Sequence, residues 1–133
     1  MKNLEHAENM LTMSRKDCNA LRGMMDNIDY FSDEIFGFHA QQAVEKAVKA
    51  LLDIFSIDYK KIHDIGELFN LLKQNGKDIP TEYLDLQDLT EYAVDLRYDS
   101  FEFGNDPLNR KMILGKVSGF IDYVQKQLKQ FKV

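Results

Sequence analysis

The fold is decided by the stretch from Phe38 to Leu52, which reads FHAQQAVEKAVKALL. It is rich in strong helix formers, and polar side chains recur in it and just beyond it at spacings of three and four: His39, Gln42, Lys46, Lys49 and Asp53. At about 100° per residue these five fall within roughly 80° of arc. The opposite face is apolar. We therefore expect a helix that buries one side and presents an imidazole, an amide and two ammonium groups outward, where they suit an anion.

Helical periodicity continues on both sides of this stretch. Spacings of three and four predict a helix over 4–29, with the inward positions Leu4, Ala7, Leu11, Ser14, Cys18, Leu21, Met25 and Ile28. The central stretch belongs to a second helix, which begins at Ser32 or Asp33, either of which suits a cap, and continues to Phe55. The two helices are predicted to form a long antiparallel hairpin.

Three further helices are predicted along the rest of the chain. Asp64, with a glutamate three residues later, suits the start of a short helix that ends near Asn75-Gly76. A long helix over 82–98 follows, and Asp106-Pro107 suits the start of the last helix. The sequence therefore predicts an all-α fold: an antiparallel up-and-down bundle of four long helices and one short helix, formed by residues 1–133 as a single domain.

Composition excludes several classes of protein. Of the 133 residues, 44% are hydrophobic and 29% charged, which is typical of a globular chain. The net charge of −5 argues against generic DNA binding, which needs an excess of Lys and Arg. The only cysteine, Cys18, permits no intrachain disulfide and is expected to pack in the core. With no signal-peptide core and no apolar run near the roughly 20 residues that span a bilayer, we expect a cytoplasmic protein.

Metal and cofactor chemistry is not predicted. The chain has no His-x-x-x-His, Glu-x-x-His or paired-carboxylate pattern, and it has no glycine-rich phosphate loop. The sequence alone therefore predicts neither a metal site nor a cofactor.

Arg97 is expected on the inward edge of the 82–98 helix, where a guanidinium needs an acceptor. Two interpretations stay open. In the first, Arg97 joins two helices through an ion pair with Asp17 or Glu45. In the second, it lies beside a groove and binds a phosphate bidentately, with the Tyr98 ring lining the groove.

The polar stripe also has an ordinary interpretation, because every amphipathic helix exposes a polar side. Glu45 and Lys49, four residues apart, would then form a surface ion pair. Among the histidines, His63 is expected in the capping network of the short helix, and His6 carries no functional signal. His39 has the best functional claim because it shares the stripe.

Three segments together resemble the HEPN family (higher eukaryotes and prokaryotes nucleotide-binding). The 39–52 stretch is similar to the family pattern H-x-x-Q-x-x-E-K-x-x-K-x-L, His63-Asp64-Ile65 to H-D-L, and Tyr92 with Arg97-Tyr98 to Y-x-x-x-x-R-Y. The resemblance covers 4–131. It implies a bundle like the carboxy-terminal domain of kanamycin nucleotidyltransferase, often dimeric and often encoded beside a minimal nucleotidyltransferase. In such pairs the helical protein assists nucleotide binding or acts as a toxin.

The resemblance also implies which residues form a nucleotide- or phosphate-binding groove: His39, Gln42, Lys46, Lys49, Arg97 and Tyr98, supported by Asp17, Glu45 and His63. Many HEPN proteins cleave RNA with an arginine that is followed four to six residues later by a histidine. No arginine of this chain has a histidine at that spacing, so the general acid–base group of that reaction is unaccounted for.

The sequence therefore favours a noncatalytic domain that binds a nucleotide or another phosphate-bearing small molecule. It is expected to act with a minimal nucleotidyltransferase in a toxin–antitoxin-like system and to form a homodimer, with no membrane partner. Two alternatives remain. One is a divergent toxin ribonuclease in which Arg97 and His39 or His63 meet in space, and the other is a purely structural dimerisation module.

Overall fold

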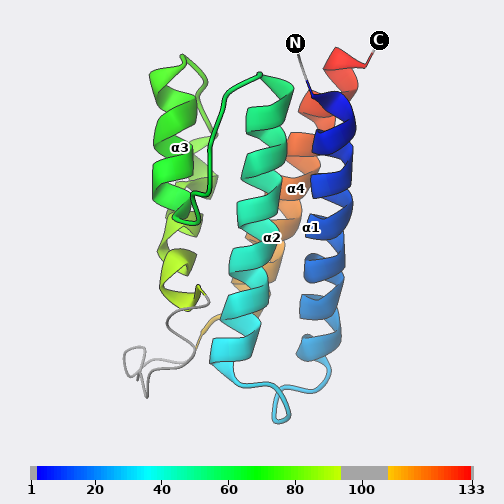
Figure 1. Cartoon of the computed structure of the whole chain (residues 1–133). Helices are drawn as coiled ribbons and strands as arrows, with labels where there is room; N and C mark the ends of the chain where they lie inside the picture. Colours follow the sequence, from blue (N-terminus) through cyan, green and yellow to red (C-terminus); the bar gives the residue numbers. More distant parts are fainter. Residues whose placement is uncertain (1–2, 94–107, 133) are drawn as a thin grey trace.

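Polar caps set the starts of four of the five helices in the computed structural model, which describes residues 3–93 and 108–132. The helices are α1 (Leu4–Met25), α2 (Asp33–Ile54), α3 (Ile65–Gln74), the 3₁₀ helix η1 (Thr81–Tyr92) and α4 (Arg110–Phe131) (Figure 1). The side chains of Asn3, Ser32, Asp64 and Asn109 each accept a backbone N–H of the first turn. No strand occurs within the described ranges, so the all-α prediction is confirmed for them.

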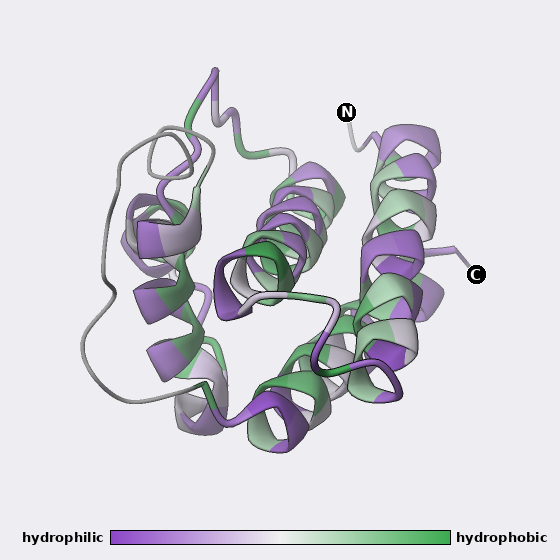
Figure 2. Ribbon diagram, turned by 90° about the horizontal axis from the view of Figure 1, so that it is seen from below, coloured by the Kyte–Doolittle hydropathy of each residue, from purple (hydrophilic) through white to green (hydrophobic). Residues whose placement is uncertain are grey.

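Helix α2 lies at the centre of the molecule, between α1 on one side and α3 with η1 on the other (Figure 1). Helix α4 packs behind the pair formed by α1 and α2. Seen from below, the hydrophobic parts of the ribbons turn largely towards one another (Figure 2). Because α2 has neighbours on several sides, most of its residues are buried, including those of the apolar face predicted from the sequence.

The predicted α1–α2 hairpin is observed. Its antiparallel direction follows from the contacts, since His6 meets Asp53 near one end and Asp17 meets His39 near the other. A strict up-and-down order is not confirmed for the whole bundle. The segment 55–64 returns along α2, so that α3 runs in the same direction as α2 (Figure 1). Left-handed backbone at Ser56 (φ 58°) and Lys60 (φ 45°) shapes this return.

The prediction of a long α-helix over 82–98 is wrong for the part that the structure describes. This part is the 3₁₀ helix η1, which ends at Tyr92. The reason is visible in the spacing of its inward residues. Tyr83, Leu86, Leu89 and Tyr92 recur strictly every three residues, which forms one row in a helix of three residues per turn and a drifting row in an α-helix. Residues 94–98 of the predicted helix lie outside the described ranges.

Two helix ends also differ from the prediction. Helix α1 ends at Met25, with Met24 buried in place of Met25, and Ile28 is exposed in the turn that follows. Helix α4 is capped by Asn109, whereas the predicted cap Asp106 lies outside the described residues.

Cys18 is buried as predicted, and burial raises the pKa of its thiol above the ordinary value.

Candidate functional site

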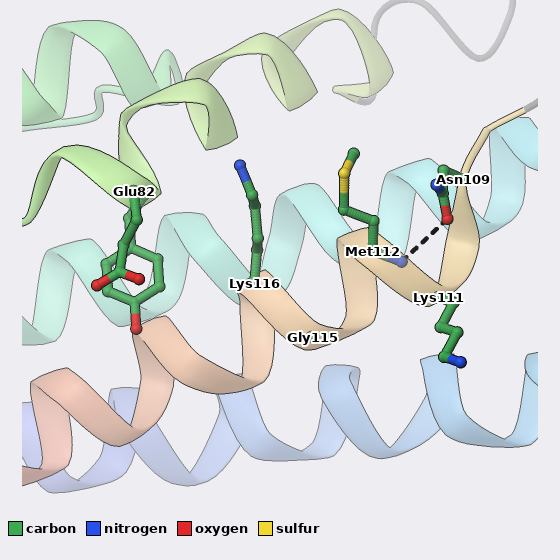
Figure 3. A pocket seen from close by; sticks show the side chains of 7 residues that line it. Glu82, Asn109, Lys111, Met112, Gly115 and Lys116 are labelled. Atoms are coloured by element: carbon green, nitrogen blue, oxygen red, sulfur yellow. Dashed lines mark hydrogen bonds between the residues drawn. The ribbon is translucent and has the colours of Figure 1, made fainter.

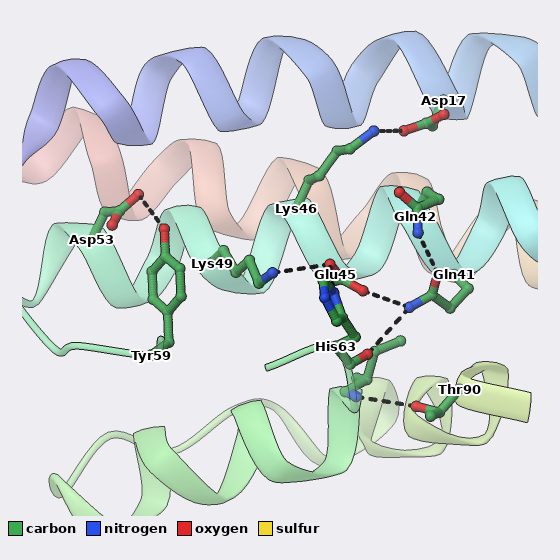
Figure 4. Close-up of polar contacts among 11 residues, drawn as sticks. Asp17, Gln41, Gln42, Glu45, Lys46, Lys49, Asp53, Tyr59, His63 and Thr90 are labelled. Carbon is green, nitrogen blue, oxygen red and sulfur yellow. Dashed lines mark hydrogen bonds and ion pairs between the residues drawn. The ribbon is translucent and has the colours of Figure 1, made fainter. Parts of the chain in front are cut away.

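The polar stripe of α2 lies between α1 and the returning segment 55–64 (Figure 4). We call this surface the α2 seam and define it by the stripe and the side chains that contact it: His6, Asp17, His39, Gln41, Gln42, Glu45, Lys46, Lys49, Asp53, Tyr59 and His63. Sequence periodicity led us to expect that the whole polar stripe points outward. That expectation is wrong for Lys49 and Asp53, which are buried, because neighbouring segments cover part of the stripe.

The first cluster of the seam is the Asp17 centre, formed by Asp17 of α1 with His39 and Lys46 of α2. Lys46 Nζ donates to Asp17 Oδ2 at 2.6 Å, and His39 Nδ1 lies 3.1 Å from Asp17 Oδ1. The side chains of His39 and Lys46 remain 32% and 23% exposed, whereas that of Asp17 is 14% exposed. One carboxylate therefore holds two donors that still reach solvent. Gln42 lies beside them, and its amide donates to Gln41 Oε1 at 2.7 Å.

The second cluster is the Glu45 centre, and it is more enclosed. Glu45 accepts from Lys49 Nζ at 3.0 Å and from Gln41 Nε2 at 2.8 Å, and it lies 3.1 Å from His63 Nδ1 (Figure 4). The Lys49 and Glu45 side chains are only 10% and 8% exposed. The pair expected on the surface therefore exists but is buried. Gln41 also donates to the His63 carbonyl at 3.3 Å, which ties the returning segment to α2.

A third cluster, the Asp53 centre, lies near the carboxyl end of α2. His6 Nδ1 is 2.6 Å from Asp53 Oδ2, and the Tyr59 hydroxyl donates to the same oxygen at 3.4 Å. Burial raises the pKa of Asp53 above its ordinary value, although the contacts with His6 and Tyr59 oppose this. Burial, together with the Asp53 charge, raises the pKa of Tyr59 to about 12. Lys49 Nζ lies 5.6 Å from the centre of the Tyr59 ring.

All three histidines of the chain therefore contact a carboxylate through Nδ1. Sequence reasoning missed His6. A signal was present, since His6 and Asp53 lie 23 and 24 residues from Asp29 in the hairpin turn and an antiparallel hairpin brings such positions together. Tyr59 was also missed, because only the folded-back segment brings it to α2.

Arg97 and Tyr98, two of the predicted site residues, lie outside the described residues. Asp17 and Glu45, the expected ion-pair partners of Arg97, are both engaged by residues of the seam. Tyr92, which begins the same motif, packs its ring against Gly37 of α2, where an added Cβ would lie 2.5 Å from the ring.

A buried arginine that the sequence did not single out joins α4 to the start of α2. Arg110 Nε donates to Asp33 Oδ1 at 3.1 Å and Nη2 to the Phe31 carbonyl at 2.5 Å. Its guanidinium carbon lies 5.2 Å from the centre of the Phe36 ring. The Leu108 amide donates to Asp33 at 3.0 Å. This cluster fixes the amino terminus of α4 and lies apart from the seam.

A hollow with a volume of about 490 Å³ lies between η1 and the first turns of α4 (Figure 3). Met112 and Lys116 project from α4 into it, above Gly115. It contains no residue of the α2 seam. Within residues 3–93 and 108–132 there is also no group of three or more His, Cys, Asp and Glu side chains that could hold a metal ion. No helix in those ranges is long and apolar enough to cross a membrane.

One family model matches most of the chain. The model of the HEPN domain matches residues 7–127, a span that includes α2, α3, η1 and most of α1 and α4. The chain therefore belongs to the HEPN domain family, as its three motifs indicate. No curated protein and no solved structure matches the chain.

Proposed function

We propose that this HEPN domain is noncatalytic and binds a nucleotide or another phosphate-bearing small molecule at the Asp17 centre. The observation that carries the proposal is that His39 and Lys46 share one carboxylate and yet stay partly exposed. An ammonium has three hydrogens, and Lys46 gives one to Asp17, so two remain for a ligand. Nε2 of His39 is the ring nitrogen not committed to Asp17.

Charge decides how such a site works. With a neutral imidazole, the charges of Asp17 and Lys46 cancel, so an incoming phosphate must compete with Asp17 for the ammonium. The benefit of Asp17 is orientation, because it holds both donors in one direction before the ligand arrives. Gln42 supplies a neutral amide beside them. Lys49 is not part of this binding site, since its ammonium is committed to Glu45. The proposal does not depend on Arg97 or Tyr98.

Calorimetry with ATP and GTP is the direct test. Protein shown to be folded by circular dichroism should give saturable heat with the nucleotides and much less with the corresponding nucleosides. Lys46→Gln should weaken binding by about tenfold, because a charged hydrogen bond to phosphate is worth roughly 1.5 kcal/mol or more. Lys116→Gln is the matched control, since Lys116 also pairs with an aspartate, Asp85, on another surface. Absence of heat at millimolar nucleotide would refute the proposal.

A second candidate function, RNA cleavage, is favoured by the His39–Asp17 pair. A carboxylate on Nδ1 fixes the imidazole so that Nε2 can exchange a proton with a substrate, and Lys46 beside it can stabilise phosphate charge. Incubation of purified protein with RNA separates the two functions. The ribonuclease function requires that His39→Ala or Arg97→Ala reduce cleavage. Cleavage that is unaffected by either substitution would reject it.

The partners form the last part of the proposal. We propose that the domain forms a homodimer and acts with a minimal nucleotidyltransferase, on the basis of family membership. The apolar side chains Ile28, Tyr30 and Ile35, exposed around the α1–α2 turn, offer a surface for either contact. Light scattering of the purified chain tests the homodimer. Co-expression with the enzyme from an adjacent reading frame, followed by gel filtration, tests the second partner.

A further inference from the structure

A cavity between α3 and η1 is separate from the α2 seam. Its volume is about 430 Å³, within the range typical of small-ligand sites. It is lined by both helices and by residues 77–79 of the segment that joins them, and all of these residues lie in a described range. The motifs and the proposed function use none of its side chains.

The walls of this cavity are fixed by backbone contacts. Helix α3 ends in a turn at Gly76 (φ 74°), where the amide of Lys77 donates to the Leu72 carbonyl at 2.9 Å and that of Gly76 donates to Lys73 at 3.0 Å. Only a residue that tolerates a left-handed backbone suits this position. The turn reverses the chain, so that Lys77 follows Lys73 around the cavity rather than continuing along the helix.

The opposite wall is held close to α3. The Ile65 amide donates to the Thr90 hydroxyl at 3.1 Å, which joins the start of α3 to η1. At Gly66, an added Cβ would lie 3.1 Å from Oε1 of Gln87, so glycine permits the close approach of η1. The cavity therefore exists without rearrangement of either helix.

The lining combines an apolar part with uncommitted polar groups. Phe69, which is nearly buried, and Leu84, which is partly exposed, supply apolar surface. Within the described part of the chain, the Asn70 amide and the Lys73 ammonium have no hydrogen-bond or ion-pair partner. The lining has two lysines and one carboxylate, that of Asp78, so it is locally positive in a chain whose net charge is −5.

We propose that the α3–η1 cavity binds a small planar anion, such as an aromatic carboxylate or a nucleoside monophosphate. The ring of the ligand contacts Phe69 and Leu84, its anionic group lies near Lys73, and the Asn70 amide hydrogen-bonds its edge. Lys77, whose ammonium lies 4.5 Å from the centre of the Phe55 ring, adds positive charge from a greater distance. Charge complementarity excludes cations, and the volume suits a molecule of one or two rings with a single anionic group. This site is independent of the Asp17 centre.

Four probes test the proposal by nuclear magnetic resonance titration: 2-naphthoate, AMP, adenosine and inorganic phosphate. We expect saturable binding of naphthoate or AMP, with shifts confined to α3, η1 and 77–81. The probe that binds more tightly shows whether the site prefers an aromatic carboxylate or a nucleoside monophosphate. Adenosine lacks the charge and phosphate lacks the ring, so each should bind at least about threefold to fivefold more weakly. If neither naphthoate nor AMP binds at millimolar concentration, the proposal is overturned.

Substitutions at exposed positions keep the test independent of folding. Asn70→Asp adds one negative charge to the cavity and Lys73→Gln removes one positive charge, so each lowers its net charge by one unit and should weaken binding about threefold to fivefold. The controls Gln74→Glu and Lys61→Gln make the same changes at exposed residues outside the lining and should leave affinity within about twofold. Equal affinity in all four variants, or shifts only around His39 and Lys46, would overturn this site. The second outcome would still support the Asp17 centre.

Discussion

The Asp17 centre and the Glu45 centre use almost the same side chains in different surroundings. Each has one carboxylate, one lysine and one histidine, and each uses lysine and carboxylate within 3.0 Å. The Asp17 centre lies at the edge of the α1–α2 contact, where its lysine and histidine reach water. At the Glu45 centre the carboxylate and the ammonium are buried, and only the histidine is exposed.

The difference teaches that exposure, rather than residue type, separates a candidate binding site from a structural ion pair. In a buried pair each charge needs the other, because desolvation makes an unpaired buried charge very costly. A half-exposed pair can exchange one partner for a ligand, because water already competes there. Periodicity alone placed Lys46 and Lys49 in one stripe, whereas the folded chain gives them different surroundings.

The largest effect should come from breaking the Glu45 centre. Glu45→Gln removes the carboxylate that neutralises Lys49 and should lower the free energy of unfolding by about 3 kcal/mol or more, because the ammonium stays buried. Urea denaturation measures the change. Asp85→Asn, which breaks a Lys–Asp pair on the surface, should cost about 1 kcal/mol or less. Similar costs for the two variants would remove the distinction between the two centres.

A smaller effect should follow from disturbing the contact between η1 and α2. In Gly37→Ala the new methyl group meets the Tyr92 ring, and overpacking of about 1–3 kcal/mol exceeds the helix preference for alanine of about 1 kcal/mol. We expect a net loss of stability and faster hydrogen exchange near Gln41. Gly115→Ala on α4, where a Cβ meets open space, should instead stabilise by up to about 1 kcal/mol. Stabilisation by both substitutions would contradict the packing of η1 on α2.

The Asp17 centre should respond differently to loss of its carboxylate. Asp17→Asn should cost about 1 kcal/mol or less, because His39 and Lys46 gain water in place of the lost charge. It should also raise nucleotide affinity several-fold, since removal of a competing negative charge outweighs the loss of the orientation that Asp17 gives to the two donors. Denaturation and calorimetry measure the two effects, with Asp122→Asn, which affects a looser pair with Arg15, as the control. Unchanged affinity would make the Asp17 centre structural as well.

Most of the fold was predictable because local signals agreed with one another. Ser32 and Asp64 cap the helices for which they were proposed, and the α1–α2 hairpin follows from their shared periodicity. The 3₁₀ helix was misjudged because a row of residues spaced by three also fits the broad apolar face of an α-helix over short lengths. The return of 55–64 was not predictable, because it rests on contacts such as that between Gln41 and the His63 carbonyl.

Several residues of the candidate site were predictable from the sequence, but how deeply each of them is buried was not. Spacing placed His39, Lys46 and Lys49 on one face, and the structure brings them to a common seam. Burial of Lys49 depends on Tyr59 and His63, which approach from a segment without helical periodicity. Pairing across helices also depends on register, which explains why the partner of His6 was missed.

The smallest effect should be a pH dependence at the Asp53 centre, which lies between the two extremes in its exposure. Burial raises the pKa of Asp53, so the folded chain keeps this proton to a higher pH than the unfolded chain does. The free energy of unfolding should therefore fall as pH rises from the ordinary value of 3.8 through the folded pKa, and the Asp53→Asn variant should lack this contribution. Denaturation of both proteins across this window measures the difference. In Tyr59→Phe the carboxyl loses a hydrogen bond that lowers its pKa, so its proton should persist to still higher pH. A downward shift in Tyr59→Phe, seen by carboxyl resonance titration, would show that the hydroxyl does not favour the charged form.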